Sequence, residues 1–230
     1  MDQPVGVKPD DFDFRFGRVG QQPLLGKNTR ILVADRKSGR FEQHPFAALP
    51  DLLAGTEVWA NKSRGSHPYF RQQAYYATEP GSYLPPTAGI PIDEAMAKRL
   101  NLRLLTLHTL CPSKQEDPWE CFTAGRTGRE WFSIPSEPSN PVSAVGTTVV
   151  KALETWGRTG ELSGWSDLFV APPFEFRVVS KFLTNFHWPR EPLLALTCAF
   201  GGCDLIREAH EMAVREGFAF SDYGDRLLVI

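Results

Sequence analysis

The segment at residues 142–156, VSAVGTTVVKALETW, is the feature that most constrains the fold of this chain. Its first four residues predict a buried strand, and Gly146 predicts a sharp turn after it. Thr147 or Thr148 then predicts the N-cap of a helix that fills the rest of the segment. A buried strand that passes through a glycine into a helix is typical of α/β proteins. We therefore expect a sheet whose strands alternate with helices.

The rest of the chain follows the same alternation. An apolar run at residues 31–34, a turn at residues 37–39 and a return at Phe41 predict a hairpin. The segment at residues 111–141 is rich in proline, glycine and charge, which predicts a long surface loop. Further strands are expected at residues 57–60, 102–107, 131–134, within 166–174, at 176–186 and within 220–230, and further helices at residues 47–53, 93–98, 191–200 and 204–216. The predicted fold class is α/β, with a mixed sheet in a single domain at residues 1–230.

The composition is that of a globular protein, because 42% of the 230 residues are hydrophobic and 23% are charged. The net charge of −2 gives no basic excess that would point to nucleic acid, although a local basic patch is compatible with that sum. No apolar run approaches the roughly 18 residues of a membrane helix. The acidic N-terminus resembles neither a secretory signal nor a transit peptide. We expect a cytoplasmic protein with no membrane partner, and the oligomeric state is left open.

The cysteine pattern does not predict a metal site. Cys111, Cys121, Cys198 and Cys203 form no C-x-x-C pair and no zinc-like spacing with histidine. The segment CAFGGC supplies two of the three or four ligands that such sites gather. We expect free thiols and no metal.

Polar residues follow several of the predicted strands. Asn61 follows the strand at residues 57–60, and His108 follows the strand at residues 102–107. Gly146 opens the loop after its strand, and Asn185 and His187 end another. Because ligands of α/β proteins collect at the carboxyl edge of the sheet, these positions are candidates for one site.

Each candidate also has a structural explanation. Strand alternation would put Asn185 and His187 on one face and Phe186 on the other, so that the histidine could transfer a proton and the asparagine could hold a ligand. The same pair could instead fix the turn before Pro189. His108 is either a base or a buried, hydrogen-bonded histidine.

The loops leave similar alternatives. The small residues of PTAG could let a ligand approach the backbone or could form a tight turn. Tyr223 and Asp225, on either side of Gly224, could orient a ligand or belong to a turn. The single glycine of VGTT falls far short of a dinucleotide or P-loop motif. The chain has no G-x-S-x-G and no H-E-x-x-H segment, so neither serine hydrolysis nor zinc catalysis is indicated.

Four segments, taken in order, resemble one family: EPGSYLPPTAGIPIDEAMAKRLNLRLLTLHT, VSAVGTTVVKALETW, DLFVAPPFEFRVVSKFLTNFHWPREPLLALTCAFGG and FAFSDYGDRLLVI. DFDF, LVADRKSGRFEQHPFAALPDLL and NKSR fit the opening of the same family. This is the S-adenosylmethionine:tRNA ribosyltransferase-isomerase family of queuosine biosynthesis. The resemblance implies transfer of a ribosyl unit from S-adenosyl-L-methionine to an aminomethyl-deazaguanine base of tRNA, with release of adenine and methionine and without a metal.

The resemblance also implies a set of site residues. The loops at residues 86–89 and 146–148 and the strand end at residues 185–187 would line the site, and residues 61–64 would close it. Catalytic roles are expected for His187, His108 and Glu130. The cofactor-binding residues are expected to be Asn61, Arg64, Pro86, Thr87, Ala88, Gly89, Gly146, Thr147, Thr148, Asn185, Phe186 and Tyr223.

The chain departs from the family pattern at several points. Only residues 65–78 stand where the family carries an inserted β-barrel domain, so we expect a mixed-sheet, barrel-like α/β domain without that insert. Pro91 and Gly128 stand where the family has histidines, and TLCPSKQEDPW replaces a glycine-rich loop. This pattern predicts a retained S-adenosylmethionine site with a changed acceptor, either a small molecule or tRNA. A genuine tRNA ribosyltransferase-isomerase and a non-catalytic S-adenosylmethionine-binding module are the alternatives.

Overall fold

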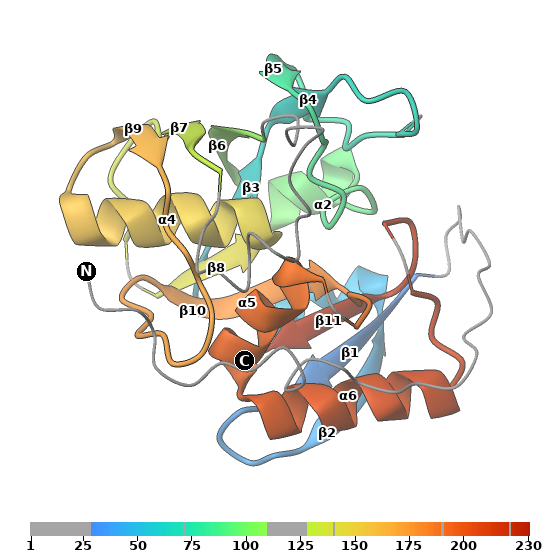
Figure 1. Ribbon diagram of the computed structural model, residues 1–230. Helices are drawn as coiled ribbons and strands as arrows, with labels where there is room; N and C mark the ends of the chain where they lie inside the picture. The colour runs from blue at the N-terminus through green and yellow to red at the C-terminus, as the bar shows by residue number, and fades with distance from the viewer. Residues whose placement is uncertain (1–28, 71, 110–127, 140, 190, 221) are drawn as a thin grey trace.

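The computed structural model describes residues 29–70, 72–109, 128–139, 141–189, 191–220 and 222–230 (Figure 1). Nine strands form one mixed sheet in the order β2-β1-β11-β10-β8-β3-β6-β7-β9. Two short strands, β4 (Ser63–Gly65) and β5 (Glu79–Ser82), form a separate parallel pair. The strands of the large sheet are β1 (Arg30–Ala34), β2 (Phe41–Pro45), β3 (Glu57–Asn61), β6 (Arg103–His108), β7 (Glu130–Ser133), β8 (Val142–Val145), β9 (Ser163–Ser166), β10 (Val179–Asn185) and β11 (Arg226–Val229).

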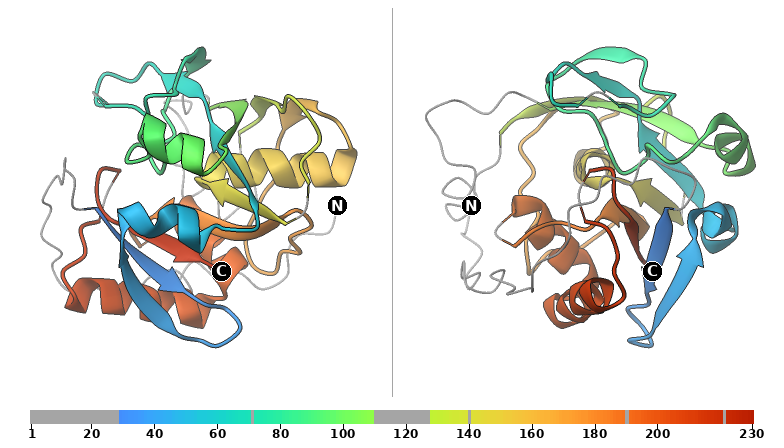
Figure 2. Two further views of the ribbon diagram at one scale, coloured as in Figure 1. Left: turned by 180° about the vertical axis from the view of Figure 1, so that it is seen from behind. Right: turned by 90° about the vertical axis from the view of Figure 1, so that its right-hand side faces the viewer.

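The helices lie on both faces of this sheet. Figure 2 shows α4, α5 and α6 on one side of the curved sheet, with α1 and α2 on the other. The described helical elements are η2 (Phe46–Ala48), α1 (Leu49–Leu52), α2 (Glu94–Arg99), α4 (Thr147–Thr159), α5 (Pro192–Gly201) and α6 (Cys203–Arg215). The predicted mixed α/β fold is thus confirmed. No helix among the described residues is long and apolar enough to cross a membrane.

The alternation of strand side chains explains why the protein has two cores. Trp59 and Phe182 point to the face covered by α4, α5 and α6, whereas Val58 and Leu183 point to the opposite face. Each face is closed by the apolar side of its helices. At about 25 cal/mol per Å² of buried apolar surface, burial on both faces is the main stabilising contribution to the fold.

The directions of the strands decide which strand ends lie at the same edge of the sheet. β3, β6, β8 and β10 are mutually parallel, so their carboxyl ends lie at one edge of the sheet. β11 runs antiparallel to β10, with Asn185 opposite Arg226. The amino end of β11 therefore lies at the same edge as the carboxyl end of β10. The loop that leads into β11 becomes part of this edge.

Two predicted local features are wrong. No strand forms within residues 167–174, and the strand of this region is β9 (Ser163–Ser166) instead. Pro172 and Pro173 lack the N–H donors that a strand would need. The N-cap of α4 is Gly146, at φ 93° and ψ 155°, and no threonine side chain caps the helix. The positive φ favours glycine at this turn.

A buried carboxylate that the sequence analysis did not single out anchors α4 to the sheet. Glu154 is fully buried, and it accepts hydrogen bonds from the backbone N–H groups of Arg177, Val178 and Val179 at 2.9–3.0 Å. Arg158, one turn later on α4, pairs with the same carboxylate at 2.6 Å. Glu154 thereby fixes the start of β10, the strand that ends in the candidate site.

Candidate functional site

The first part of the candidate site is the junction of β3, β6 and α4. The Oδ1 atom of Asn61 accepts from the backbone N–H groups of Ser63 and Leu107 at 3.0 and 3.1 Å. Its Nδ2 atom donates to the carbonyl oxygen of Leu107 at 2.9 Å and to Thr148 Oγ1 at 3.3 Å. The carboxamide is therefore fully used within the fold. Asn61 lies at the predicted edge, but its side chain holds Thr148 in place and has no bond left for a ligand.

The second part is the contact between two loops that are far apart in the sequence. A Cβ atom on Gly146 would lie 3.6 Å from the Cβ atom of Ala88, so the loop after β8 meets the PTAG loop. A Cβ atom on Gly89 would lie 1.8 Å from the hydroxyl oxygen of Tyr76. Glycine is therefore required at position 89, because the Tyr76 hydroxyl already fills the space. The structure thus brings the PTAG and VGTT loops together.

The third part is a hydrogen-bonded chain at the end of β10. Asn185 Nδ2 donates to Thr87 Oγ1 at 2.7 Å, and Thr87 Oγ1 donates to Asp222 Oδ1 at 3.0 Å. Asn185 is 6% exposed, and its Oδ1 atom has no hydrogen-bond partner among the described residues. Burial raises the pKa of the Asp222 carboxyl, although the hydrogen bond from Thr87 opposes this rise. Three segments therefore share one polar chain.

Arg226 connects the loops around this chain. Its guanidinium is fully buried and donates only to backbone carbonyl oxygens. Burial lowers the pKa of Arg226 to about 10, and the nearby Asp225 and Asp222 oppose this shift. The carbonyls belong to Ala88 at 2.9 Å, Thr87 at 3.0 Å, Asp225 at 3.2 Å, Asp222 at 3.4 Å and Gly224. Arg226 thus holds the PTAG loop against the loop that leads into β11.

His187 lies next to this cluster, but its ring does not point where strand alternation predicts. β10 ends at Asn185, so the alternation no longer applies to His187. Its Nε2 atom lies 2.9 Å from Thr184 Oγ1, and its Nδ1 atom lies 3.5 Å from the Glu191 carboxylate. The expectation that Asn185 and His187 share one face is therefore wrong. His187 lies close enough to the Asp222 carboxyl to influence it electrostatically.

Phe186 belongs to the hydrophobic core. It is 1% exposed and packs among the rings of His210, Phe218 and Phe220, at centroid distances of 5.0–5.7 Å. It points into the core, as expected for the face opposite Asn185. Its position therefore gives it no direct route to a ligand.

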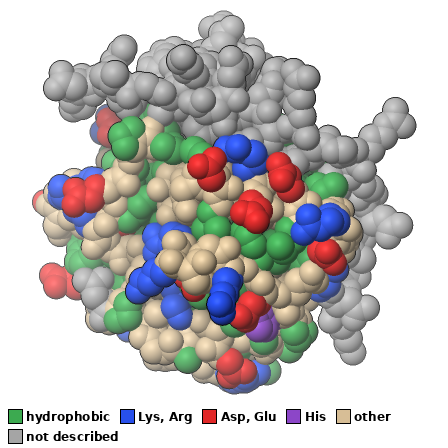
Figure 3. Space-filling view, turned by 90° about the horizontal axis from the view of Figure 1, so that it is seen from below, with side chains coloured by type: hydrophobic (Ala, Val, Ile, Leu, Met, Phe, Trp, Pro, Cys, Tyr) green, Lys and Arg blue, Asp and Glu red, His purple; other side chains and the backbone are tan. Residues whose placement is uncertain are grey.

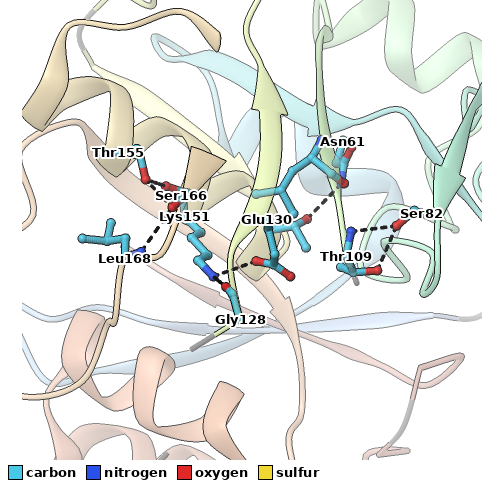
Figure 4. Close-up of polar contacts among 11 residues, drawn as sticks. Asn61, Ser82, Thr109, Gly128, Glu130, Lys151, Thr155, Ser166 and Leu168 are labelled. Carbon is cyan, nitrogen blue, oxygen red and sulfur yellow. Dashed lines mark hydrogen bonds and ion pairs between the residues drawn. The ribbon is translucent and has the colours of Figure 1, made fainter. Parts of the chain in front are cut away.

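Glu130 and His108 lie farther along the sheet, at the edge formed by β6 and β7. Figure 4 shows Glu130 paired with Lys151 of α4, with Nζ and Oε2 2.7 Å apart. Both side chains are largely buried, so the carboxylate already has a cation partner. The ring of His108 contacts Trp131 edge-on at 5.6 Å, and its Nε2 atom has no hydrogen-bond partner within the described ranges. Thr87, Asn185, Asp222 and Arg226 together form the Asp222 cluster. No described contact joins Glu130 or His108 to it.

The other predicted residues divide between the loops. Pro86 and Thr147 are half-buried members of the PTAG and VGTT loops. Tyr223 directly follows Asp222, lies near the backbone of Gln72, and has a pKa raised by burial. Arg64 is exposed on β4, directly after Ser63. The DFDF segment and Cys111 and Cys121 lie outside the described residues, and Cys198 and Cys203 are not joined by a disulfide.

Sequence reasoning missed Asp222, Arg226 and Glu191. The charged residues of SDYGDR, just before an apolar final strand, were the available signal. Among the described residues, no three His, Cys, Asp or Glu side chains gather closely enough to hold a metal ion. The arrangement can present hydrogen-bond acceptors and backbone atoms to a polar organic ligand.

The family model described as queuosine biosynthesis protein matches residues 66–229. The chain belongs to this family. The matched range includes the PTAG loop, the VGTT loop, the end of β10 and the loop into β11. All parts of the Asp222 cluster therefore lie within the part of the chain that the family model covers.

Curated relatives support the same assignment. An S-adenosylmethionine:tRNA ribosyltransferase-isomerase of Sulfurihydrogenibium sp. is 38% identical over 240 residues, which cover 96% of this chain and 67% of the relative. The enzyme of the same name from Rubrobacter xylanophilus is 40% identical over 69% of this chain and 51% of its own length. The chain therefore spans about two thirds of the first relative and about half of the second.

A solved structure of the family has the same fold. The crystal structure of an S-adenosylmethionine tRNA ribosyltransferase from Thermotoga maritima superimposes with a TM-score of 0.68 and 23% sequence identity. The superposition covers 96% of this chain and 100% of that chain. At this identity the likeness shows the shared fold.

Proposed function

We propose that this member of the queuosine biosynthesis family is a transferase-isomerase that uses S-adenosylmethionine as the ribosyl donor and tRNA as the acceptor. The observation that carries the proposal is the 38% identity, over 96% of this chain, to a relative named for that reaction. The structure adds that the loops expected to line the site meet at one edge of the sheet. The chain spans only part of the length of these relatives, so their complete activity is a proposal for this chain.

The donor would be held at the edge formed by the PTAG loop, the VGTT loop and the end of β10. A sulfonium makes the adjacent C–H acidic and is a good leaving group, so the protein has to orient the donor, move protons and exclude water. Thr87 and Asn185 are rigid polar contacts at this edge. His187, beside Asp222, is the residue of this edge best suited to transfer a proton near neutral pH.

The relatives favour tRNA over a small molecule as the acceptor. Every curated relative reported above is named for tRNA, and no comparison supports the small-molecule acceptor that the altered histidines suggested. The face in Figure 3 carries Lys and Arg side chains interspersed with Asp and Glu, so a tRNA surface is not evident on that face. Turnover measured with and without tRNA is therefore the best test of which acceptor the enzyme uses.

The first prediction concerns the dependence of turnover on tRNA. Incubation with S-adenosylmethionine and tRNA from cells that lack this activity should release adenine and methionine and should label the tRNA from ribose-labelled donor. The same mixture without tRNA should release no adenine above the enzyme-free rate. Chromatography of the small products and scintillation counting of the tRNA measure both quantities.

Two results would count against this function. Adenine release that does not depend on tRNA would remove tRNA as the acceptor. Formation of methylthioadenosine in place of adenine would show attack on the methionine side chain, which is not ribosyl transfer.

The second prediction concerns the start of α4. Thr148→Val should weaken S-adenosylmethionine binding about tenfold, because the loss of one hydroxyl hydrogen bond costs about 1 kcal/mol and Asn61 loses its partner there. Calorimetric titration measures the dissociation constant. Thr159→Val, at the far end of the same helix, is the matched control and should leave it unchanged. Equal dissociation constants for Thr148→Val and the wild type would exclude Thr148 from the donor site.

A further inference from the structure

The end of β10 carries a group of hydrogen-bond acceptors, and one of them, Asn185 Oδ1, has no partner among the described residues. Glu191 Oε2 accepts from the backbone N–H of Trp188 at 3.1 Å, and Asp222 Oδ1 accepts from Thr87 at 3.0 Å. Asn185, Asp222 and Glu191 bring a carboxamide oxygen and two carboxylates to the space around Thr87 and His187. The carboxylate of Glu191 acts electrostatically on that of Asp222, so the two acids share one neighbourhood. Glu191 is 42% exposed, which places it on the solvent side of the group.

The hydrogen-bond chain fixes the orientation of the Asn185 carboxamide. Thr87 has one hydroxyl hydrogen, and it is donated to Asp222 Oδ1. The Thr87 oxygen must therefore accept from Asn185, so the NH₂ group of Asn185 faces Thr87. Asn185 Oδ1 is then left as a buried acceptor with no partner in the described part of the chain. A buried acceptor without a donor is destabilising, so a ligand that brings a donor to it would be favoured.

The neighbouring basic side chains, Arg226 and His187, do not supply that donor. Arg226 directs its five N–H groups to five backbone carbonyl contacts, so none is left for the Asp222 carboxylate. His187 lies near Asp222, but its nitrogens face Thr184 and Glu191. Burial raises the pKa of Asp222 although the Arg226 guanidinium lies nearby, so its negative charge would gain from a further cation.

We propose that Asn185, Asp222 and Glu191 form a binding site for a primary ammonium group, and that this group is the α-ammonium of the methionyl part of S-adenosylmethionine. An ammonium has three N–H donors and a positive charge, which match one neutral and two anionic acceptors. This inference rests on the proposed function, because it takes S-adenosylmethionine as the ligand. It assigns Asp222 a direct contact that the sequence did not predict.

The test compares two ligands on two proteins. S-Adenosylmethionine and its analogue with hydrogen in place of the α-amine are titrated calorimetrically into the wild type and Asp222→Asn. Asparagine can still accept from Thr87, so the variant should keep the loop in place. Asp222→Asn should weaken S-adenosylmethionine binding tenfold or more and should change binding of the desamino analogue less than twofold. Glu191→Gln should give a smaller loss with the same ligand preference.

The control is Asp51→Asn, which removes a carboxylate whose side chain is 83% exposed, and which should change neither affinity. If Asp222→Asn weakens both ligands equally, or weakens neither, the ammonium site is wrong while S-adenosylmethionine binding by the wild type stands. If the wild type binds neither ligand, the proposed function and the ammonium site are both overturned. Thermal unfolding of each variant separates loss of contact from loss of fold.

Discussion

Replacing Arg226 with methionine is expected to lower the free energy of unfolding by about 3–5 kcal/mol and to abolish S-adenosylmethionine binding. The guanidinium is fully buried, and its loss would leave five carbonyl contacts in two loops without their donor. Methionine fills a similar volume, so the effect comes from the missing hydrogen bonds and not from a cavity. Urea unfolding gives the free energy, and calorimetry gives the affinity.

Arg226→Lys separates the charge from the geometry. Lysine keeps a positive charge but has three donors on one nitrogen, which cannot reach all of the carbonyls that the planar guanidinium joins. We expect an intermediate loss of stability. Arg40→Met, in the exposed turn after β1, is the matched control and should change stability by less than about 0.5 kcal/mol. If Arg226→Met were as stable as this control, Arg226 would not hold the two loops together.

The second large effect is expected at His187. His187→Ala should lower kcat about 10²–10⁴-fold while the protein stays folded, because general acid–base catalysis typically contributes that factor. His187 lies 2.9 Å from Thr184 Oγ1 and acts electrostatically on Asp222. Steady-state turnover with tRNA measures kcat, and circular dichroism confirms the fold. His44→Ala, on the edge strand β2, should leave turnover unchanged.

His187→Gln distinguishes catalysis from positioning. Glutamine can replace the hydrogen bond to Thr184, but it does not transfer protons near neutral pH. A catalytic histidine predicts that the glutamine variant regains stability and stays slow, and that the limb of the pH–rate profile due to the imidazole disappears. Turnover restored by glutamine would instead make His187 a positioning residue.

Much of the sheet was predictable from local patterns. Apolar runs next to turn residues gave β1, β3, β6 and β8 within a few residues, because the central residues of each strand are buried and need a continuous apolar stretch. The failures were local. The strand expected within residues 166–174 does not form at residues 167–174, where prolines remove donors, and the cap of α4 is Gly146. The single-domain boundary at residues 1–230 stays a prediction.

The candidate site was predictable only in part. Asn61, Gly146 and Asn185 follow parallel strands, so their arrival at one edge follows from the strand order. The sequence could not show which of these side chains keep a hydrogen-bonding group available for a ligand. The Asn61 side chain is fully used by Ser63, Leu107 and Thr148, and Glu130 is paired with Lys151. Those partners are set by long-range packing, which no local pattern encodes.

By itself, the sequence determined the α/β class and the strand ends, because hydrophobic periodicity and turn chemistry act over a few residues. Only the tertiary structure decided that β11 runs antiparallel to β10 and so places Asp222 and Arg226 beside Asn185 and Thr87. Residues 87 and 222 are 135 positions apart, and what joins them is the register of two strands and one buried guanidinium. That pairing depends on how the whole sheet buries its two faces, which no single segment specifies.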